Sequence, residues 1–120
     1  MTTVTDAVED LFNNRGLSVQ EAVDRHYAPG FRQRTDGHWD DRAALLARTA
    51  ALRDVVERAT ITVLDELSDG PRYAERHVID LAQRDGGHIV REVFVFAERD
   101  ADGRFVRIEE ATLPHGGSPM

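Results

Sequence analysis

Apolar residues in the first part of the chain recur with the period of an α-helix. Val4, Val8, Leu11 and Phe12 fall at positions i, i+4, i+7 and i+8, which share one face of a helix. Gly16 follows as a stop signal. The spacing therefore predicts a short first helix that ends before this glycine.

A second helix is predicted to begin after Ser18, which can form a capping box with Glu21 three residues later. Pro29-Gly30 ends it, because proline cannot continue a helix. The inner side of this helix is predicted to carry Ala22, Val23, His26 and Tyr27.

A third helix is predicted to open near Asp40 or Asp41 and to run to about Glu57 or Arg58. Residues that would share one face of this helix recur at positions i, i+4, i+7 and i+11. They are Leu45, Thr49, Leu52 and Val56.

The remaining segments have the composition of strands. Residues 31–35 predict a short strand and residues 36–39 a loop. Four longer strands follow, separated by short loops that contain glycine: residues 60–68, 72–84, 88–99 and 104–112. Loops this short join antiparallel neighbours. Helices followed by an antiparallel meander indicate an α+β fold, with the helices packed in a strongly curved, mostly antiparallel sheet. We expect one domain over residues 1–113 and a disordered tail over residues 114–120.

Neither face of the predicted strands is cleanly apolar. In the strand over residues 72–84, one face carries Tyr73, Glu75, His77, Ile79 and Leu81, and the other carries Ala74, Arg76, Val78 and Asp80. A curved sheet explains this pattern, because its concave side can hold helices and a polar-lined pocket while its outer side packs on a partner subunit. Positions 93–96 of one strand are all apolar, so both sides of this strand carry apolar residues, as a sheet that is covered on both faces requires. We therefore expect a homodimer through the outer face of the sheet.

Composition narrows the possible partners. The chain has 120 residues, no cysteine and a formal net charge of −7. It is long enough to bury one core without disulfides. The acidic balance argues against nucleic acid, whose phosphates require a basic surface. No apolar run approaches the roughly 20 residues of a membrane helix. Residues 1–10 lack the basic and apolar regions of a secretory signal, so we expect a cytoplasmic protein that binds neither nucleic acid nor membrane.

Common metal, phosphate and nucleophile motifs are missing from the sequence. The five histidines show no H-E-x-x-H or other close ligand spacing. Gly86-Gly87 suits a hairpin rather than a phosphate loop, and there is no G-x-S-x-G motif. We accordingly predict no metal site and no cofactor.

Three segments carry a resemblance to a known family. Residues 23–31 (VDRHYAPGF) are similar to its second helix end and first strand, and residues 69–78 (DGPRYAERHV) to the turn and strand after its third helix. Residues 94–96 and 102–110 (FVF and DGRFVRIEE) are similar to its closing hairpin. Over about residues 4–113 the chain resembles the NTF2-like superfamily, and within it the SnoaL-like proteins.

The resemblance implies a conical α+β barrel, usually dimeric, with a deep pocket between sheet and helices. The superfamily includes ketosteroid isomerases, polyketide cyclases, epoxide hydrolases and many non-catalytic binders. The aspartate base and tyrosine/aspartate pair of the isomerases have no complete match here. The aspartate and histidine of the cyclases have only possible substitutes, Glu110 and His77.

Ionisable residues inside such a pocket are the candidates for catalysis, because burial raises the pKa of a carboxyl toward neutral pH. Glu110 alternates with the apolar residues of the last strand, and His77 and Glu92 lie on the two strands before it. A base and an acid from this set could perform proton transfer without a metal. We therefore predict Glu110, His77 and Glu92 as catalytic residues.

Five further residues are predicted to line the ligand pocket. They come from the end of the second helix, the first short strand, the loop at the expected pocket mouth and the apolar run near the end of the chain. These residues are Tyr27, Arg34, His38, Trp39 and Phe94.

Each candidate also has a purely structural interpretation. Glu110 can be a solvated strand end, and His77 can be an ordinary core histidine. Glu92 can form an ion pair with Arg91, or with Arg76 on the adjacent strand. Tyr27 and Trp39 can simply fill the core.

Two hypotheses about function follow. The first is a small-molecule protein that binds an apolar or aromatic metabolite in its cone and catalyses acid/base chemistry of the isomerase, cyclase or epoxide-hydrolase type. The alternative is a non-catalytic ligand-binding or dimerisation module. A deep apolar cavity would favour the first hypothesis, and a cone filled by aromatic side chains the second.

Overall fold

The computed structural model describes residues 1–115 as three α-helices, one π-helical turn and six strands. The elements are α1 (Val4–Val8), η1 (Glu9–Asn13), α2 (Val19–His26), β1 (Tyr27–Thr35), β2 (His38–Asp41), α3 (Arg42–Val55), β3 (Val56–Asp69), β4 (Arg72–Gln83), β5 (His88–Arg99) and β6 (Phe105–Pro114). The expected tail at residues 114–120 begins inside the last strand, and residues 116–120 lie outside the described part.

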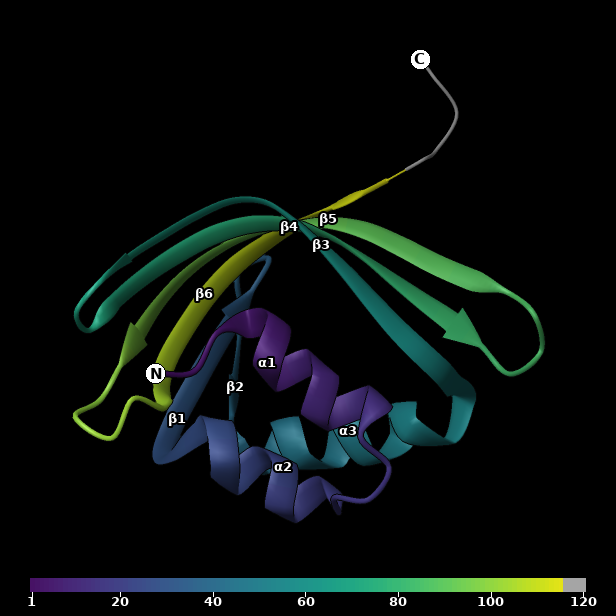
Figure 1. Cartoon of the computed structure of the whole chain (residues 1–120), viewed down its shortest axis with the longest axis horizontal. Helices are drawn as coiled ribbons and strands as arrows, with labels where there is room; N and C mark the ends of the chain where they lie inside the picture. Colours follow the sequence, from purple (N-terminus) through teal and green to yellow (C-terminus); the bar gives the residue numbers. More distant parts are fainter. Residues whose placement is uncertain (116–120) are drawn as a thin grey trace.

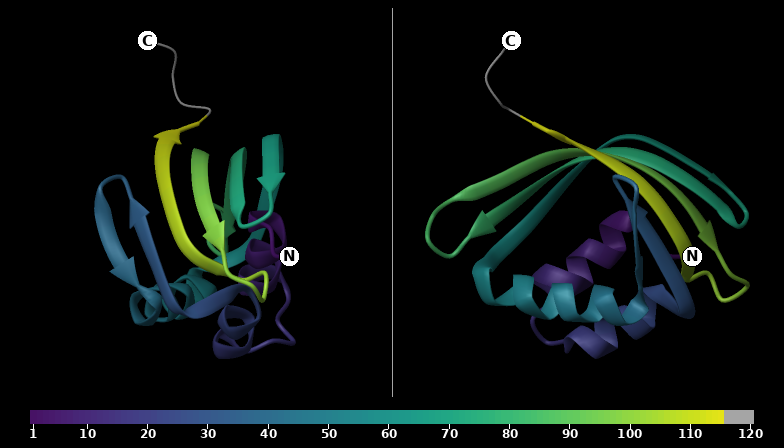
Figure 2. Two further views of the ribbon diagram at one scale, coloured as in Figure 1. Left: turned by 90° about the vertical axis from the view of Figure 1, so that its left-hand side faces the viewer. Right: turned by 180° about the vertical axis from the view of Figure 1, so that it is seen from behind.

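All six strands form one sheet in the order β2-β1-β6-β5-β4-β3. Only β1 and β6 run parallel, and every other neighbouring pair is antiparallel. The sheet arches over the helices, which lie against its concave side (Figures 1 and 2). The predicted α+β class and the strong curvature are thus confirmed. The sheet is an open arch with β2 and β3 at its two edges, rather than a closed barrel.

Side-chain caps begin all three α-helices, and those of α2 and α3 lie where the sequence predicted them. Thr3 caps α1, and Ser18 and Glu21 form the reciprocal capping box of α2. Asp41 caps α3 through a bond from the backbone N–H of Ala44. Side chains at these positions satisfy N–H groups that the first helical turn leaves without partners.

The second helix ends three residues before the predicted Pro29-Gly30 break. Tyr27 is already extended, and β1 continues through Pro29 and Gly30. The pairing of β1 with β6 is irregular between Tyr27 and Arg32, which accommodates a proline that has no N–H to donate. The third helix likewise ends at Val55, slightly earlier than predicted, because the strand begins at Val56.

Residues 36–39, predicted as a loop, belong to a tight hairpin. Asp36 and Gly37 both have positive φ angles, 50° and 90°, as a two-residue type I′ turn requires. Trp39 then pairs with Arg34 in β2. Asp36 also accepts bonds from the backbone N–H and the hydroxyl of Thr112, so the hairpin is anchored on β6.

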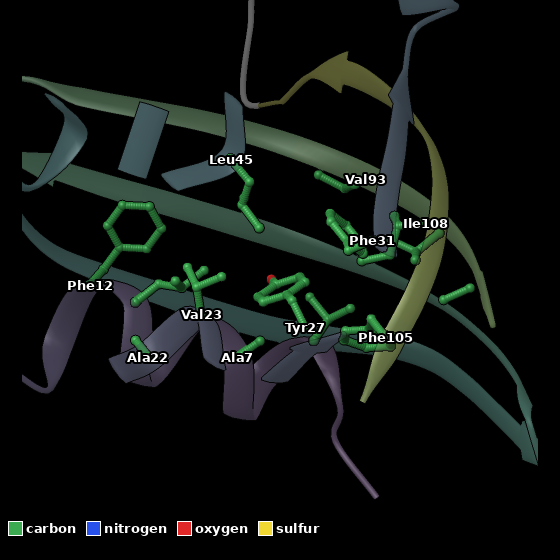
Figure 3. Packing of buried hydrophobic residues seen from close by; sticks show 14 of the residues in the cluster. Ala7, Phe12, Ala22, Val23, Tyr27, Phe31, Leu45, Val93, Phe105 and Ile108 are labelled. Atoms are coloured by element: carbon green, nitrogen blue, oxygen red, sulfur yellow. The ribbon is translucent and has the colours of Figure 1, made fainter. Parts of the chain in front are cut away.

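The core fills the space between the helices and the concave face. Figure 3 shows Tyr27 among Val23, Phe31 and Phe105, and the ring centroids of Tyr27 and Phe31 are 4.7 Å apart. The sheet contributes the inward residues of β4, β5 and β6. These inward core residues are Tyr73, Val93, Val95, Ala97, Phe105 and Ile108.

The predicted two faces of β4 are observed. Tyr73, Glu75 and His77 are buried on the concave side. On β5 the outward residues include Phe94, 37% exposed, and Phe96, 70% exposed. The sheet therefore has apolar residues on both sides and buried charge on the concave one.

A buried polar chain fastens the start of the protein to α2. The Thr2 hydroxyl is hydrogen-bonded to Nδ1 of His26, and Nε2 of His26 lies 2.6 Å from an Asp10 carboxylate oxygen. Arg99 completes the attachment by donating to the backbone oxygen of Thr2 at 3.0 Å. These contacts join the N-terminus, the π-helical turn, α2 and the sheet.

We predict that His26→Ala lowers the free energy of unfolding by about 2–3 kcal/mol, because it removes the partner of the buried Thr2 hydroxyl and the closest partner of the Asp10 carboxylate, and it leaves a cavity. His88→Ala is the matched control, since His88 is 53% exposed and bonds to an exposed Asp80. It should change stability by less than about 0.5 kcal/mol. Urea unfolding of the three proteins measures both values, and equal effects would contradict the structural role of His26.

Candidate functional site

Polar side chains gather on the concave face where β4, β5 and β6 lie side by side. Glu75 pairs with Val95, which pairs with Glu110, which pairs in turn with Thr35 of β1. Because strands are about 4.8 Å apart, this row spans the middle of the sheet. His77 follows Glu75 by two residues and shares its face.

Glu75 and His77 form a buried pair within β4. Nδ1 of His77 lies 2.5 Å from Oε1 of Glu75, and the two side chains are 4% and 0% exposed. The second carboxylate oxygen of Glu75 is sealed from solvent and has no partner among the described residues. A buried carboxylate with so few partners is costly, and its one close contact is therefore strong.

Two side chains of the parallel strand β1 hold the carboxyl group of Glu110. Its Oε1 accepts hydrogen bonds from the Gln33 amide at 2.8 Å and from the Thr35 hydroxyl at 3.0 Å. Burial raises the pKa of the Glu110 carboxyl above its ordinary value. The Thr35 and Gln33 hydrogen bonds, and the neighbouring His77 and Arg48 side chains, offset that effect only in part. A raised pKa favours the protonated form, which can donate a hydrogen bond or a proton.

Tyr27 stands at the start of β1, with its ring inside the core (Figure 3). Burial raises the pKa of its hydroxyl well above the ordinary value, and the charge of Glu110 adds to the increase while that of Arg48 opposes it. The phenol therefore stays protonated as a hydrogen-bond donor. These electrostatic couplings place the Tyr27 hydroxyl, Glu110 and Arg48 in one neighbourhood.

Three polar atoms of this cluster make no hydrogen bond within residues 1–115: the Tyr27 hydroxyl, Nε2 of His77 and Oε2 of Glu110. They are also absent from the sealed, unpartnered side-chain atoms, which are Arg42 Nε, Glu75 Oε2 and Arg99 Nε. Each of the three therefore borders space that a water-sized group can reach. The concave side thus carries a donor, a potential base and a carboxyl, each with one polar atom that has no partner within residues 1–115.

The predicted site residues separate into two groups. Tyr27, His77 and Glu110 come together on the concave side. Glu92 does not join them, because the alternation along β5 turns it outward, where it accepts from Arg76 at 3.2 Å. That contact is the cross-strand ion pair considered as the alternative for this residue.

The remaining predicted pocket residues also lie outside the concave cluster. Phe94 is on the outer face, where Arg34 contacts Glu109 at 3.3 Å. Trp39 is 42% exposed on β2, with the Arg32 guanidinium 4.5 Å above its ring. These placements correct the expected pocket lining: Arg34 and Trp39 lie outside the concave cluster, and Phe94 faces outward because the alternation along β5 is opposite to the one assumed.

His38 lies on the concave side of β2, opposite Thr35, but its side chain is 79% exposed. His38 therefore lies at the solvent-exposed edge of the concave side and not within the cluster.

Four residues of the cluster were not predicted. Gln33 and Thr35 reach Glu110 only through the parallel pairing of β1 and β6, which short-range pattern analysis does not reveal. Arg48 on α3 bonds to Asp40 at 2.9 Å and approaches the cluster from the helix side. Glu75 was assigned to the correct face, and its i, i+2 spacing to His77 was the available signal for a pair.

No group of three potential metal ligands occurs within residues 1–115. No helix in the same part of the chain is long and apolar enough to cross a membrane.

No protein-family model matches the sequence, and no curated protein matches it. Solved structures do match. An NTF2-like protein of unknown function from Exiguobacterium sp. 255-15 aligns with a TM-score of 0.66 at 16% identity, covering 96% of this chain and 100% of that one.

Two other matching structures carry functional names. A candidate isomerase from Rhodopseudomonas palustris aligns with a TM-score of 0.72 at 12% identity, covering 90% of this chain and 84% of that one. A candidate SnoaL-like polyketide cyclase from Jannaschia sp. CCS1 gives 0.62 at 17% identity, covering 90% and 83%. The chain has the NTF2-like fold of these structures, as the resemblance of its sequence implied.

We predict that Glu110→Gln gains stability relative to the wild type as pH rises from about 4 to 7. The unfolded chain loses the Glu110 proton near the ordinary carboxyl pKa, whereas the folded chain keeps it to a higher pH. The free energy of unfolding of the wild type therefore falls through this window, by about 1.4 kcal/mol for each unit of raised pKa, and the glutamine variant lacks that loss.

Urea unfolding at a series of pH values measures the free energy of unfolding of Glu110→Gln and of the wild type, and their difference is followed against pH. Glu109→Gln is the control on the neighbouring, outward position, where the hydrogen bond from Arg34 lowers the pKa of the carboxyl. Because that pKa is lowered, the difference between Glu109→Gln and the wild type should run in the opposite direction and only below the ordinary carboxyl pKa, and it should be nearly constant from about pH 5 to 7. A Glu110→Gln difference that does not change with pH would contradict burial of this carboxyl.

Proposed function

We propose that this protein binds a small apolar or aromatic metabolite beneath the concave face of its sheet and catalyses proton transfer on it. The observation that carries the proposal is the trio of unpartnered, reachable atoms on Tyr27, His77 and Glu110. Polar atoms in a protein interior normally have partners. Three open ones in a single neighbourhood suit a ligand that supplies the missing contacts.

The chemistry that suits this trio is general acid/base catalysis. Nε2 of His77 accepts a proton from the substrate, and protonated Glu110 donates one to a substrate oxygen. The Tyr27 hydroxyl stabilises negative charge on that oxygen by hydrogen bonding. Return of the proton from His77 and reprotonation of Glu110 complete a cycle with no net change in protons. Isomerisation and ring closure or opening both fit this sequence.

The surroundings favour an apolar or aromatic ligand. Leu46, Leu52, Ile61 and Ile79 are only partly buried where they pack on the core, and they can cover apolar ligand surface. The matching structures named as a candidate isomerase and a candidate cyclase support the same general class of small-molecule chemistry.

A non-catalytic binding module is the second proposal. It is favoured by the aromatic filling of one end of the space, where Phe105 contacts both Tyr27 and Tyr73. Such filling leaves less volume for a substrate. Trp39, Phe94 and Phe96 do not contribute to it, because they lie on the outer face of the sheet or its edge hairpin.

A proton-transfer assay separates the two proposals. Exchange of α-protons for deuterium is followed by proton NMR in D₂O, with a panel of aromatic and alicyclic ketones as probes. We expect the wild type to accelerate exchange of at least one ketone, and His77→Gln and Glu110→Gln to reduce the rate by about 100-fold or more. Glu92→Gln, on the outer face of the sheet, should leave it unchanged.

Either of two results would contradict catalysis by this cluster. The first is full activity in both cluster variants. The second is a ketone that binds to the wild type, detected by ligand-observed NMR, without any acceleration of exchange. The second result would support the binding module.

We also propose that two copies associate through the outer face of the sheet. Leu67 and Phe96 are 75% and 70% exposed there, and Leu113 is 51% exposed. A groove of about 450 Å³ on the same face is lined by Leu67, Ala74 and Phe96 among others. Interleaved ion pairs such as Arg76–Asp65 and Arg107–Glu98 surround these apolar residues. Exposed apolar surface with a charged rim is typical of an association face.

We predict a dimer mass by light scattering at micromolar concentration, and a monomer mass for Phe96→Ser. Val55→Ser is the control, because Val55 is 49% exposed at the end of α3, away from the sheet face. A wild-type monomer, or a Phe96→Ser variant that remains dimeric, would overturn this interface.

A further inference from the structure

We propose that Glu75 is the positioning residue of His77: its carboxylate accepts a hydrogen bond from Nδ1–H and leaves Nε2 unprotonated toward the concave space. This inference rests on the proposed function, because it explains how His77 can serve as a base. It concerns a residue that makes no contact with the open space itself.

The geometry of β4 supports this role. Residues two apart on a strand project from the same face, so Glu75 and His77 are held side by side by the backbone. Their close contact joins Oε1 to Nδ1 at 2.5 Å, and both side chains are almost fully buried. Within residues 1–115 this is the hydrogen bond that orients the ring.

The partner of one imidazole nitrogen decides the protonation of the other. A carboxylate is an acceptor only, so Nδ1 must carry the hydrogen that joins them. A neutral ring has one N–H, and Nε2 then retains its lone pair. The sealed Oε2 of Glu75 has no other donor in the described part of the chain, which makes Nδ1–H the main compensation for that buried charge.

The other charged and titratable groups near the ring suit the same arrangement. Glu110 faces His77 from β6, Arg48 approaches from α3, and the Tyr27 hydroxyl comes from the start of β1. Apolar Val93 and Val95 separate β4 from β6 along the sheet. His77 thus has a close acceptor at Nδ1, and Nε2 has no hydrogen-bond partner within residues 1–115.

This arrangement gives the two catalytic candidates different tasks. His77 is a base from the outset, since its proton is on the nitrogen away from the ligand. Glu110, in its desolvated position, is the proton donor. Without Glu75, a neutral His77 could carry its proton on Nε2 and present a donor to the substrate in place of a base.

Nitrogen NMR of the full chain, with ¹⁵N-labelled histidine, tests the inference without a substrate. Long-range proton–nitrogen correlation spectra at about pH 8 distinguish the two neutral tautomers, and His77→Gln assigns the His77 signals. We expect the wild type to show Nδ1 protonated and Nε2 bare. We expect Glu75→Gln to lose that pattern, because a glutamine amide can also donate to Nδ1.

Glu66→Gln is the matched control. Glu66 pairs with Glu75 across β3 and β4, but its carboxylate accepts from the Tyr73 hydroxyl at 2.7 Å. This variant should keep the wild-type tautomer. If the tautomer of His77 changed only because a charge was lost or packing was disturbed on this part of the sheet, Glu66→Gln would show the same change.

Three outcomes would overturn the role of Glu75. They are a wild-type His77 with its proton on Nε2, a His77 with both nitrogens protonated at about pH 8, and a Glu75→Gln variant with the wild-type tautomer. If Glu75→Gln fails to fold, the wild-type spectrum alone decides. Failure of the ketone assay leaves this measurement intact, so the two proposals can fail separately.

Discussion

The pairing register of β4, β5 and β6 decides which side chains enter the space beneath the sheet. Side chains alternate between the two faces along β4, β5 and most of β6, where the pairing with β5 is irregular only between Phe105 and Arg107. A shift of the register by one residue would exchange the two faces. With the observed register, Glu75, Val95 and Glu110 form one row on the concave side, and Arg76, Phe94 and Ala111 form the next row on the outer side. Both the candidate site and the apolar outer face depend on this register.

The helices cover the concave row of side chains that contains Glu75, Val95 and Glu110. α2 and α3 cover the concave side and exclude water from much of it, so a carboxyl there has a raised pKa and a phenol remains protonated. The parallel strand β1 adds Gln33 and Thr35, whose hydrogen bonds hold one oxygen of Glu110 and leave the other free. Curvature, helix cover and strand order together bring these polar side chains onto one buried face.

Local signals predicted the elements well, and long-range pairing explains what they could not predict. The limits of β5 follow from the glycine-containing turns on either side, and the capping box of α2 follows from Ser18 and Glu21. Which face of β5 is concave depends on where the helices pack, so Glu92 could not be placed by alternation alone. The contact between Thr35 and Glu110 joins residues 75 apart in sequence and arises only when β1 and β6 run parallel.

Buried charge by itself does not indicate function, and Arg99 shows why. Its guanidinium is only 3% exposed, but its terminal nitrogens donate to the backbone oxygens of Thr2 and Gly70 and to the Ser68 hydroxyl, and it stacks 5.0 Å from the Tyr73 ring. Those bonds give it a structural task. His77 and Glu110 instead have one polar atom held by the protein and one left open. A fold selected for stability alone would place apolar side chains there, because unpaired polar atoms weaken a core. Half-satisfied groups whose second polar atom is not sealed are therefore the reason to regard this face as a candidate site rather than as ordinary core.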